Sequence, residues 1–206
     1  MNEEITIFGI AGSIRRHSYN RMALNTAKEL MPGGVTLDIF TDLAAIPPFN
    51  EDTEFMPEPI VVDLKARIRN ASCVLIVTPE YNYGIPGVLK NAIDQASRPS
   101  GDNVWDGKPV AIMGTSISAF GSARAQYQLR QSFVFLNMHA INQPEVMIPN
   151  AAEQFDANGA LTNAVSRKLM GELLENLVDR AIEYERKTPE IPFSGFRPRG
   201  VAPRKS

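Results

Sequence analysis

Several residue types that define common functional classes are scarce in this sequence. Its 206 residues include one cysteine and two histidines. A single cysteine cannot form an internal disulfide, so a reducing compartment is expected. Cys73 begins an apolar run that ends at Val77, which favours a buried small side chain over a redox nucleophile. His17 and His139 are far apart in sequence and lack the spacing of metal ligands, so no metal is expected.

Charge of one sign and long apolar segments are also missing. The chain has 21 lysines and arginines against 23 acidic residues, a formal net charge of −2. Such a balance gives no electrostatic surface for nucleic acid or anionic membrane. The acidic segment 1–4 leads directly into a strand-like run, unlike a signal peptide, and no stretch has the length of a membrane helix. We therefore expect a cytoplasmic protein with no membrane or nucleic-acid partner.

Two common nucleotide-binding motifs are absent as well. The sequence contains no Gly-x-x-x-x-Gly-Lys-Ser/Thr and no Gly-x-Gly-x-x-Gly. The first absence argues against a nucleoside triphosphate loop, and the second against a Rossmann dinucleotide site.

The sequence does contain a regular alternation of short apolar runs and segments with helical spacing. The runs are residues 5–11, 35–40, 73–78, 109–114 and 140–147, and the helical segments are residues 20–30, 60–70, 86–97, 122–137 and 161–185. This alternation predicts an α/β fold with a doubly wound parallel sheet and helices on both faces. Five strands in this length fit the flavodoxin-like order 2-1-3-4-5. The apolar stripe of the last helix favours packing on the sheet over a partner-binding face.

The length of the chain suits one domain, which we assign to residues 1–186. From Lys187 the composition changes to proline, glycine and basic residues. Residues 187–206 are therefore predicted to be a tail without a packed element, and a docking arm on a neighbouring subunit is the alternative.

Ligands of doubly wound sheets bind beyond the carboxyl ends of the strands, where the strand order reverses. Here that position corresponds to three loops. Loop one, residues 12–20, carries serines, an arginine and an asparagine before a predicted helix. Ser13, Arg15, Ser18 and Asn20 could surround one phosphate, because a helix N-terminus and a guanidinium both favour anions. The alternative is a polar surface loop with a helix cap.

Loop three, residues 79–87, follows the most apolar strand. Tyr81, Asn82 and Tyr83 offer aromatic faces and an amide to a flat heterocycle. The alternative is an aromatic loop that closes the sheet end or packs in a subunit interface. Loop four, residues 114–124, is rich in small residues that would let a ligand lie close to the backbone. Arg124, at its end, is either a ligand contact or an interface ion-pair residue.

With these loops in place, three segments carry a resemblance to a known family. They are Gly-Ser-Ile-Arg-x-x-Ser-x-Asn (12–20), Pro-Glu-Tyr-Asn-Tyr-Gly-Ile-Pro-Gly-Val-Leu-Lys-Asn-Ala-Ile-Asp (79–94) and Gly-Ser-Ala-Arg-x-Gln-x-x-Leu-Arg (121–130). Over about residues 5–182 the chain resembles the NADPH-dependent FMN reductase family, in the branch of chromate, quinone and azo-dye reductases. The resemblance implies bound FMN, with NADPH or NADH as co-substrate, and a homodimer or homotetramer.

The implied activity is an NAD(P)H oxidoreductase that passes hydride through FMN to quinones, azo compounds, metal oxyanions such as chromate, or free flavin. No catalytic side chain is required, because the flavin carries the chemistry. The resemblance implies that the phosphate lies on loop one, the ribityl chain and ring on loop three, and the far side of the flavin on loop four. The expected cofactor-binding residues are Ser13, Arg15, Ser18, Tyr19, Asn20, Pro79, Glu80, Tyr81, Asn82, Tyr83, Ser116 and Gly121.

Two positions depart from the family pattern. Gly84 stands where the family often has serine, and Gln95 where it often has tryptophan. The first change removes a hydroxyl near the expected ring site, and the second a large side chain near the expected interface. Glu80 is interpreted as a carboxylate that fixes loop three rather than as a general base.

Two other functional classes stay open from the sequence. One is a non-enzymatic flavodoxin-like electron carrier, although carriers usually have a strongly acidic surface and a loop one of threonines and glycine, where this chain has a near-neutral balance and Arg15. The other is a regulatory module that binds a partner through the basic tail. The physiological acceptor and the choice between NADPH and NADH are not determined by these motifs.

Overall fold

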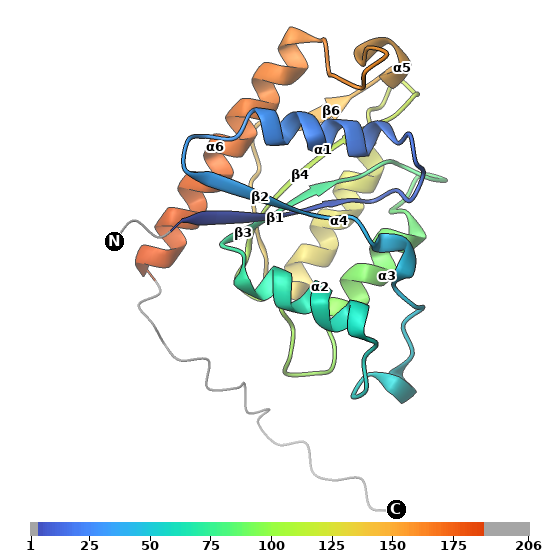
Figure 1. Cartoon of the computed structure of the whole chain (residues 1–206), viewed down its shortest axis with the longest axis vertical. Coiled ribbons are helices and arrows are strands. Elements are labelled where there is room, and N and C mark those ends of the chain that lie inside the picture. The colour runs from blue at the N-terminus through green and yellow to red at the C-terminus, as the bar shows by residue number, and fades with distance from the viewer. Residues whose placement is uncertain (1–3, 188–206) are drawn as a thin grey trace, which may run out of the picture.

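The computed structural model describes residues 4–187, which form a parallel sheet covered by helices on both faces (Figure 1). The strands are β1 (Ile5–Ala11), β2 (Val35–Phe40), β3 (Cys73–Val77), β4 (Pro109–Thr115), β5 (His139–Ala140) and β6 (Val146–Ile148). The helices are α1 (Tyr19–Glu29), α2 (Pro59–Asn70), α3 (Gly87–Ala96), α4 (Ala123–Leu136), α5 (Ala151–Gln154) and α6 (Ala164–Lys187), with 3-10 turns η1 (Leu43–Ala45) and η2 (Glu51–Thr53). Except for Lys187, the expected tail 187–206 lies outside the described residues.

The strand order is β2-β1-β3-β4-β5, and every pairing is parallel, which confirms the predicted topology. The prediction of one continuous last strand over residues 140–147 is wrong, because the structure has two short strands there. β5 pairs with the start of β4, at Pro109 and Val110, while β6 pairs with its end, at Met113 to Thr115. Pro144 lies between β5 and β6, and proline has no N–H to donate to a strand ladder.

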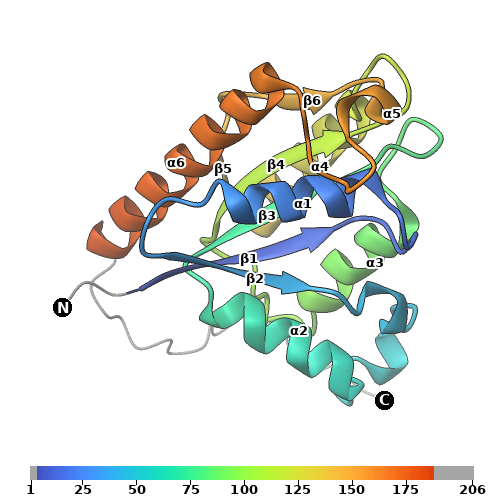
Figure 2. The ribbon, with the colours of Figure 1, turned by 45° about the horizontal axis from the view of Figure 1, so that its top comes forward.

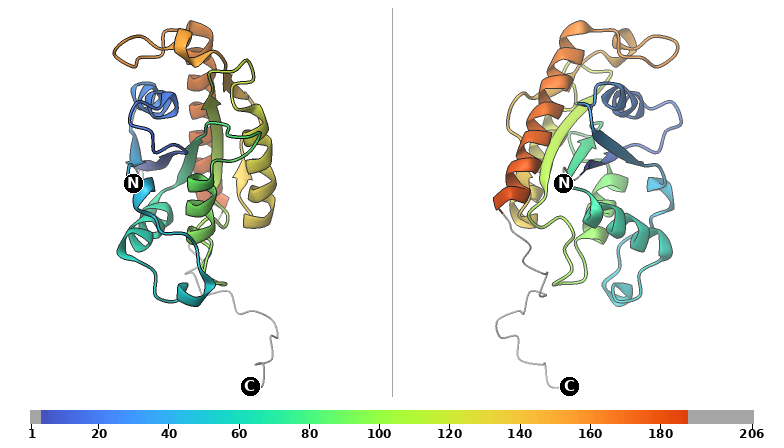
Figure 3. Two further views of the ribbon diagram at one scale, coloured as in Figure 1. Left: turned by 90° about the vertical axis from the view of Figure 1, so that its right-hand side faces the viewer. Right: turned by 60° about the vertical axis from the view of Figure 1, so that its left-hand side comes forward.

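Two cores lie on opposite faces of the sheet. One is formed with α1 and α6, and the other with α2, α3 and α4 (Figures 2 and 3). Side chains of β3 alternate between them: Cys73, Leu75 and Val77 enter the first, and Val74 and Ile76 the second. All five are fully buried, as expected for a central parallel strand.

The apolar stripe of α6 packs on the sheet, as predicted. Met170, Leu173, Leu174 and Leu177 belong to the first core, whereas Val165, in the first turn of the helix, is exposed. Burial of these side chains leaves little of the stripe for a partner.

The segment between β2 and α2 is fastened to α3 by two amide side chains. Asn91 Nδ2 donates to Pro47 O at 2.7 Å, and Asn91 Oδ1 accepts from Phe49 N at 2.8 Å. Gln95 Nε2 also donates to Pro47 O, at 3.0 Å. Gln95, at the position where tryptophan was expected from the resemblance, therefore binds a loop of its own chain.

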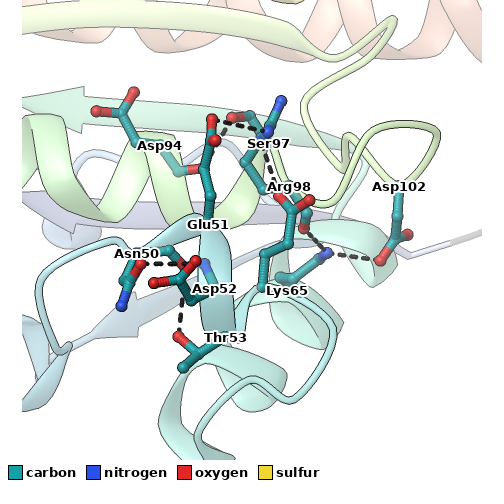
Figure 4. Close-up of polar contacts among 10 residues, drawn as sticks. Asn50, Glu51, Asp52, Thr53, Lys65, Asp94, Ser97, Arg98 and Asp102 are labelled. Carbon is teal, nitrogen blue, oxygen red and sulfur yellow. Dashed lines mark hydrogen bonds and ion pairs between the residues drawn. The ribbon is translucent and has the colours of Figure 1, made fainter. Parts of the chain in front are cut away.

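Figure 4 shows an ion-pair network that continues this attachment. Arg98 pairs with Glu51 at 3.3 Å and with Glu54 at 2.9 Å. The buried amino group of Lys65 contacts Asp102 at 2.5 Å and also the carbonyl of Arg98. The network joins α2 to the segments that precede it and that follow α3, and none of the expected cofactor-binding residues takes part in it.

Candidate functional site

The three predicted loops meet at the carboxyl edge of the sheet, toward which the strand arrowheads point in Figure 2. Backbone hydrogen bonds join them in series. Gly12 N donates to Val77 O at 2.8 Å, and Thr78 N donates to Met113 O at 2.9 Å. The side chain of Asn20 extends the series to Thr115: Nδ2 donates to Thr115 O and Oδ1 accepts from Thr115 N, both at 3.0 Å. Asn20 therefore holds loop one against the end of β4.

Loop one leaves the start of α1 open to an acceptor. Ser18 is the N-cap residue, yet its side chain makes no capping bond, and the first turn carries no acidic residue. The N–H groups of a first helical turn have no intrahelical partner. The Ser13 hydroxyl accepts from Arg15 N at 3.3 Å, and the exposed guanidinium of Arg15 lies 5.4 Å from the ring centre of Tyr19. This arrangement suits a phosphate.

Loop three folds into a two-residue hairpin. Tyr81 N donates to Gly84 O at 3.2 Å, and Gly84 N donates to Tyr81 O at 2.9 Å. Asn82 and Tyr83, between them, have φ values of 49° and 66°. Asparagine tolerates this left-handed conformation, whereas a tyrosine there is strained. Such a turn persists only where the surrounding structure holds it.

The start of α4 supplies part of that support. The carboxylate of Glu80 accepts from Arg124 N at 2.9 Å and from Arg124 Nε at 2.5 Å. Its side chain is only 6% exposed. The N-cap residue Ser122 makes no side-chain cap, so Glu80 caps α4 from another loop. As interpreted from the sequence, Glu80 fixes loop three.

The guanidinium of Arg124 also contacts two aromatic rings. It lies 3.7 Å from the ring centre of Tyr83 and 4.6 Å from that of Phe120. Cation–π contacts of this kind are attractive within about 6 Å. Arg124 thus joins loop three to loop four.

Loop four is pressed closely against neighbouring backbone. A Cβ at Gly114 would lie 2.1 Å from Thr78 O and from the Ser122 hydroxyl. Gly121 has a φ of 53°, and its Cβ would lie 2.6 Å from the carbonyl carbon of Met147. Only glycine fits these two positions without displacing backbone.

Large apolar side chains remain exposed around this edge. Tyr81 is 52% exposed, Tyr83 68%, Ile117 76% and Phe120 59%. One buried polar atom is also without a hydrogen bond: the hydroxyl of Thr115 has no partner within residues 4–187. A ligand with an aromatic part and a polar part would satisfy both features.

The structure places every expected cofactor-binding residue on one of the three loops at this edge. Sequence reasoning missed the roles of Thr115, the last residue of β4, and of Gln128, whose side chain contacts loop three. Only the helical spacing of Gln128, one turn after Arg124, could have suggested the second contact.

Comparison with known proteins decides what kind of site this is. The family model of the NADPH-dependent FMN reductases matches residues 5–153. The chain belongs to this family. It is 47% identical over 178 residues to the NAD(P)H-dependent FMN reductase PA1204 of Pseudomonas aeruginosa, covering 86% of this chain and 95% of that one. It is 41% identical over 161 residues to the 2-hydroxy-1,4-benzoquinone reductase of a Burkholderia species, covering 78% and 87% of the two chains.

A solved structure agrees with these relatives. FerB, a flavoenzyme NAD(P)H:(acceptor) oxidoreductase from Paracoccus denitrificans, superposes with a TM-score of 0.80 at 33% identity, covering 87% of this chain and 98% of that one. The predicted family, the oxidoreductase class and the use of FMN with NAD(P)H are confirmed. The electron-carrier alternative is not supported.

The described residues fit FMN at this edge. The open start of α1 and Arg15 suit the phosphate, the unpartnered Thr115 hydroxyl suits a polar ligand atom, and the exposed tyrosines suit the ring. Within residues 4–187, no group of three or more His, Cys, Asp or Glu side chains is arranged to hold a metal. No helix in the same range has both the length and the apolar character needed to cross a membrane.

Proposed function

We propose that loop one binds the FMN phosphate through Ser13, Arg15, Ser18 and the first turn of α1, which includes Tyr19. The uncapped start of α1 beside a free guanidinium carries this proposal. Asn20 contributes mainly by holding the loop, because its oxygen and one amide hydrogen are engaged by Thr115. Its second amide hydrogen is available to the phosphate.

The ring is proposed to lie between loops three and four. Pro79 to Tyr83 would border one side of it, with Glu80 contributing backbone because its carboxylate caps α4. Ser116 and Gly121 would border the far side. When bound, FMN supplies hydride transfer between NAD(P)H and an acceptor. The protein supplies the orientation of the ring and an open apolar face beside it.

Quinones are the proposed acceptors. Relatives are named quinone reductases, and exposed Tyr83, Ile117 and Phe120 offer a planar apolar molecule a surface on which to stack. Azo compounds, metal oxyanions such as chromate, and free flavin are further candidates for the same open face. A cytoplasmic location is proposed with them, supported by the buried free thiol of Cys73.

A homodimer or homotetramer is also proposed. The outer side of α4 leaves large apolar side chains uncovered: Tyr127 is 50% exposed, Val134 83% and Phe135 89%. Exposed apolar patches of this kind mark association surfaces. Mass photometry of the purified protein would test the assembly, and a monomer across the working concentration range would exclude it.

Two measurements test the function itself. The absorbance spectrum of the purified protein should show bound flavin, and reverse-phase analysis should identify it as FMN. Steady-state oxidation of NADPH and of NADH should then be measured with a benzoquinone or ferricyanide as acceptor. FMN-loaded protein that gives no turnover with either nicotinamide would overturn the proposed activity.

A further inference from the structure

The side-chain amide of Gln128, on the second turn of α4, is paired with the backbone of loop three. Nε2 donates to Tyr83 O, and Oε1 accepts from Ile85 N, both at 3.2 Å. These two backbone groups flank Gly84 on the side opposite Tyr81. Gly84 therefore lies between two pairs of hydrogen bonds, one from Tyr81 and one from Gln128. The amide of Gln128 therefore makes the pair of backbone hydrogen bonds that a neighbouring strand would otherwise make.

The amide lies close to the place that a side chain at residue 84 would occupy. A Cβ on Gly84 would lie 3.0 Å from Gln128 Oε1 and 3.7 Å from Nε2. Such a contact is tighter than ordinary van der Waals packing, so the amide would have to shift by a few tenths of an ångström. Gly84 and Gln128 are therefore complementary in this chain: the missing side chain of one makes room for the other.

The hairpin needs this support, because it holds two consecutive residues in the left-handed region. Asn82 and Tyr83 have positive φ values, and loop three is otherwise held to α4 through Glu80, before the turn, and Arg124. Gln128 is the contact on the far side of the turn. Without it, the segment from Tyr83 to Ile85 loses both of its backbone bonds to α4.

We propose that Gln128, with Gly84 opposite it, is a positioning residue that fixes the loop-three hairpin beside the flavin ring. This inference rests on the proposed function, since it takes loop three to contact the ring. Holding the hairpin in advance lowers the ordering cost of binding. It also fixes the polar groups that set the potential of the flavin.

The test compares Gln128→Met with wild type in the full-length FMN-loaded protein. Methionine keeps the length of the side chain but not its hydrogen bonds. We expect the Kd for FMN to rise about tenfold, the equivalent of about 1.4 kcal/mol, with a measurable shift in the flavin midpoint potential. Gln131→Met, at an exposed position one turn further along α4, is the control and should leave both unchanged.

A double-mutant cycle adds a second criterion. Gly84→Ala should lengthen the hydrogen bonds of the amide and reproduce part of the effect of Gln128→Met, whereas the same change in a Gln128→Ala background should cost little. Additive effects would show that the two residues are not coupled. An unchanged Kd and potential in Gln128→Met would overturn the inference while wild type still binds FMN and turns over. Failure of wild type to do either would instead overturn the proposed function.

Discussion

The carboxylate of Glu80, in the loop after β3, caps the start of α4 and pairs with the side chain of Arg124. One side chain thus joins two loops that are 44 residues apart in sequence. Because Arg124 also stacks on Tyr83 and Phe120, the ion pair fixes the aromatic rim of the site as well as its backbone.

Replacing Glu80 with glutamine should destabilise the protein. The substitution removes the charge from several hydrogen bonds of a nearly buried carboxylate and sets an NH2 group among N–H donors. We expect the free energy of unfolding in urea to fall by about 1–3 kcal/mol. Asp63→Asn is the control, because Asp63 is exposed and its ion pair with Arg67 is long, at 3.8 Å. This substitution should cost less than about 1 kcal/mol. Equal losses in both variants would contradict the bracing role of Glu80.

Arg15→Ala should weaken FMN binding without changing the fold. Within residues 4–187 the guanidinium of Arg15 makes no hydrogen bond or ion pair, so folding does not depend on it. Loss of a charge-assisted bond to phosphate should raise the Kd about ten- to hundredfold in calorimetry. The neighbouring exposed Arg16→Ala serves as control. If Arg15→Ala binds FMN as wild type does, the phosphate lies elsewhere.

Two glycine substitutions should act in opposite directions. Gly114→Ala forces a methyl group to within 2.1 Å of Thr78 O and should cost about 1–3 kcal/mol or more of unfolding free energy. Gly171→Ala, in α6 with no neighbouring atom within 4 Å of the added Cβ, should stabilise by about 0.5–1 kcal/mol. Chemical unfolding of both variants checks this, and a neutral Gly114→Ala would show that β3 and β4 can separate at the site.

Cys73 should make stability depend on pH in the alkaline range. Burial raises the pKa of its thiol from 9.0 to about 12. The unfolded chain therefore loses this proton first as the pH rises above about 9, and the folded state is progressively disfavoured up to about 12. Below pH 9 the thiol is protonated in both the folded and the unfolded state, so it does not make the stability depend on pH.

The measurement is urea unfolding of wild type and Cys73→Ala at pH 8 to 11. The stability of wild type should fall relative to the variant, by at most about 1.4 kcal/mol per pH unit. The pKa of Lys108 is lowered, mainly by burial; Lys108 is present in both proteins, so its burial affects both profiles alike. Parallel pH profiles would mean that the thiol ionises in the folded state as readily as in the unfolded one.

Local signals in the sequence were sufficient for the strand order and for the three loops. The apolar run Cys73 to Val77 identifies a strand buried on both faces, and loops that follow parallel strands must share one edge of the sheet. These local signals failed at the last strand. There, the segment that looks continuous in sequence is divided into β5 and β6, which pair with the two ends of β4. Local propensity contains no information about a partner strand.

Sequence patterns were enough to identify the family and the fold. The partner of each polar side chain in the three loops became known only from the tertiary structure. Asn20 bonds to Thr115, 95 residues away, and Gln128 bonds to Ile85, 43 residues away. Polar residues in loops are read from sequence as ligand contacts, but a buried polar group takes whichever partner the fold brings to it. Long-range packing makes that choice, and so the buried side chains of Asn20 and Glu80 hold loops of their own chain.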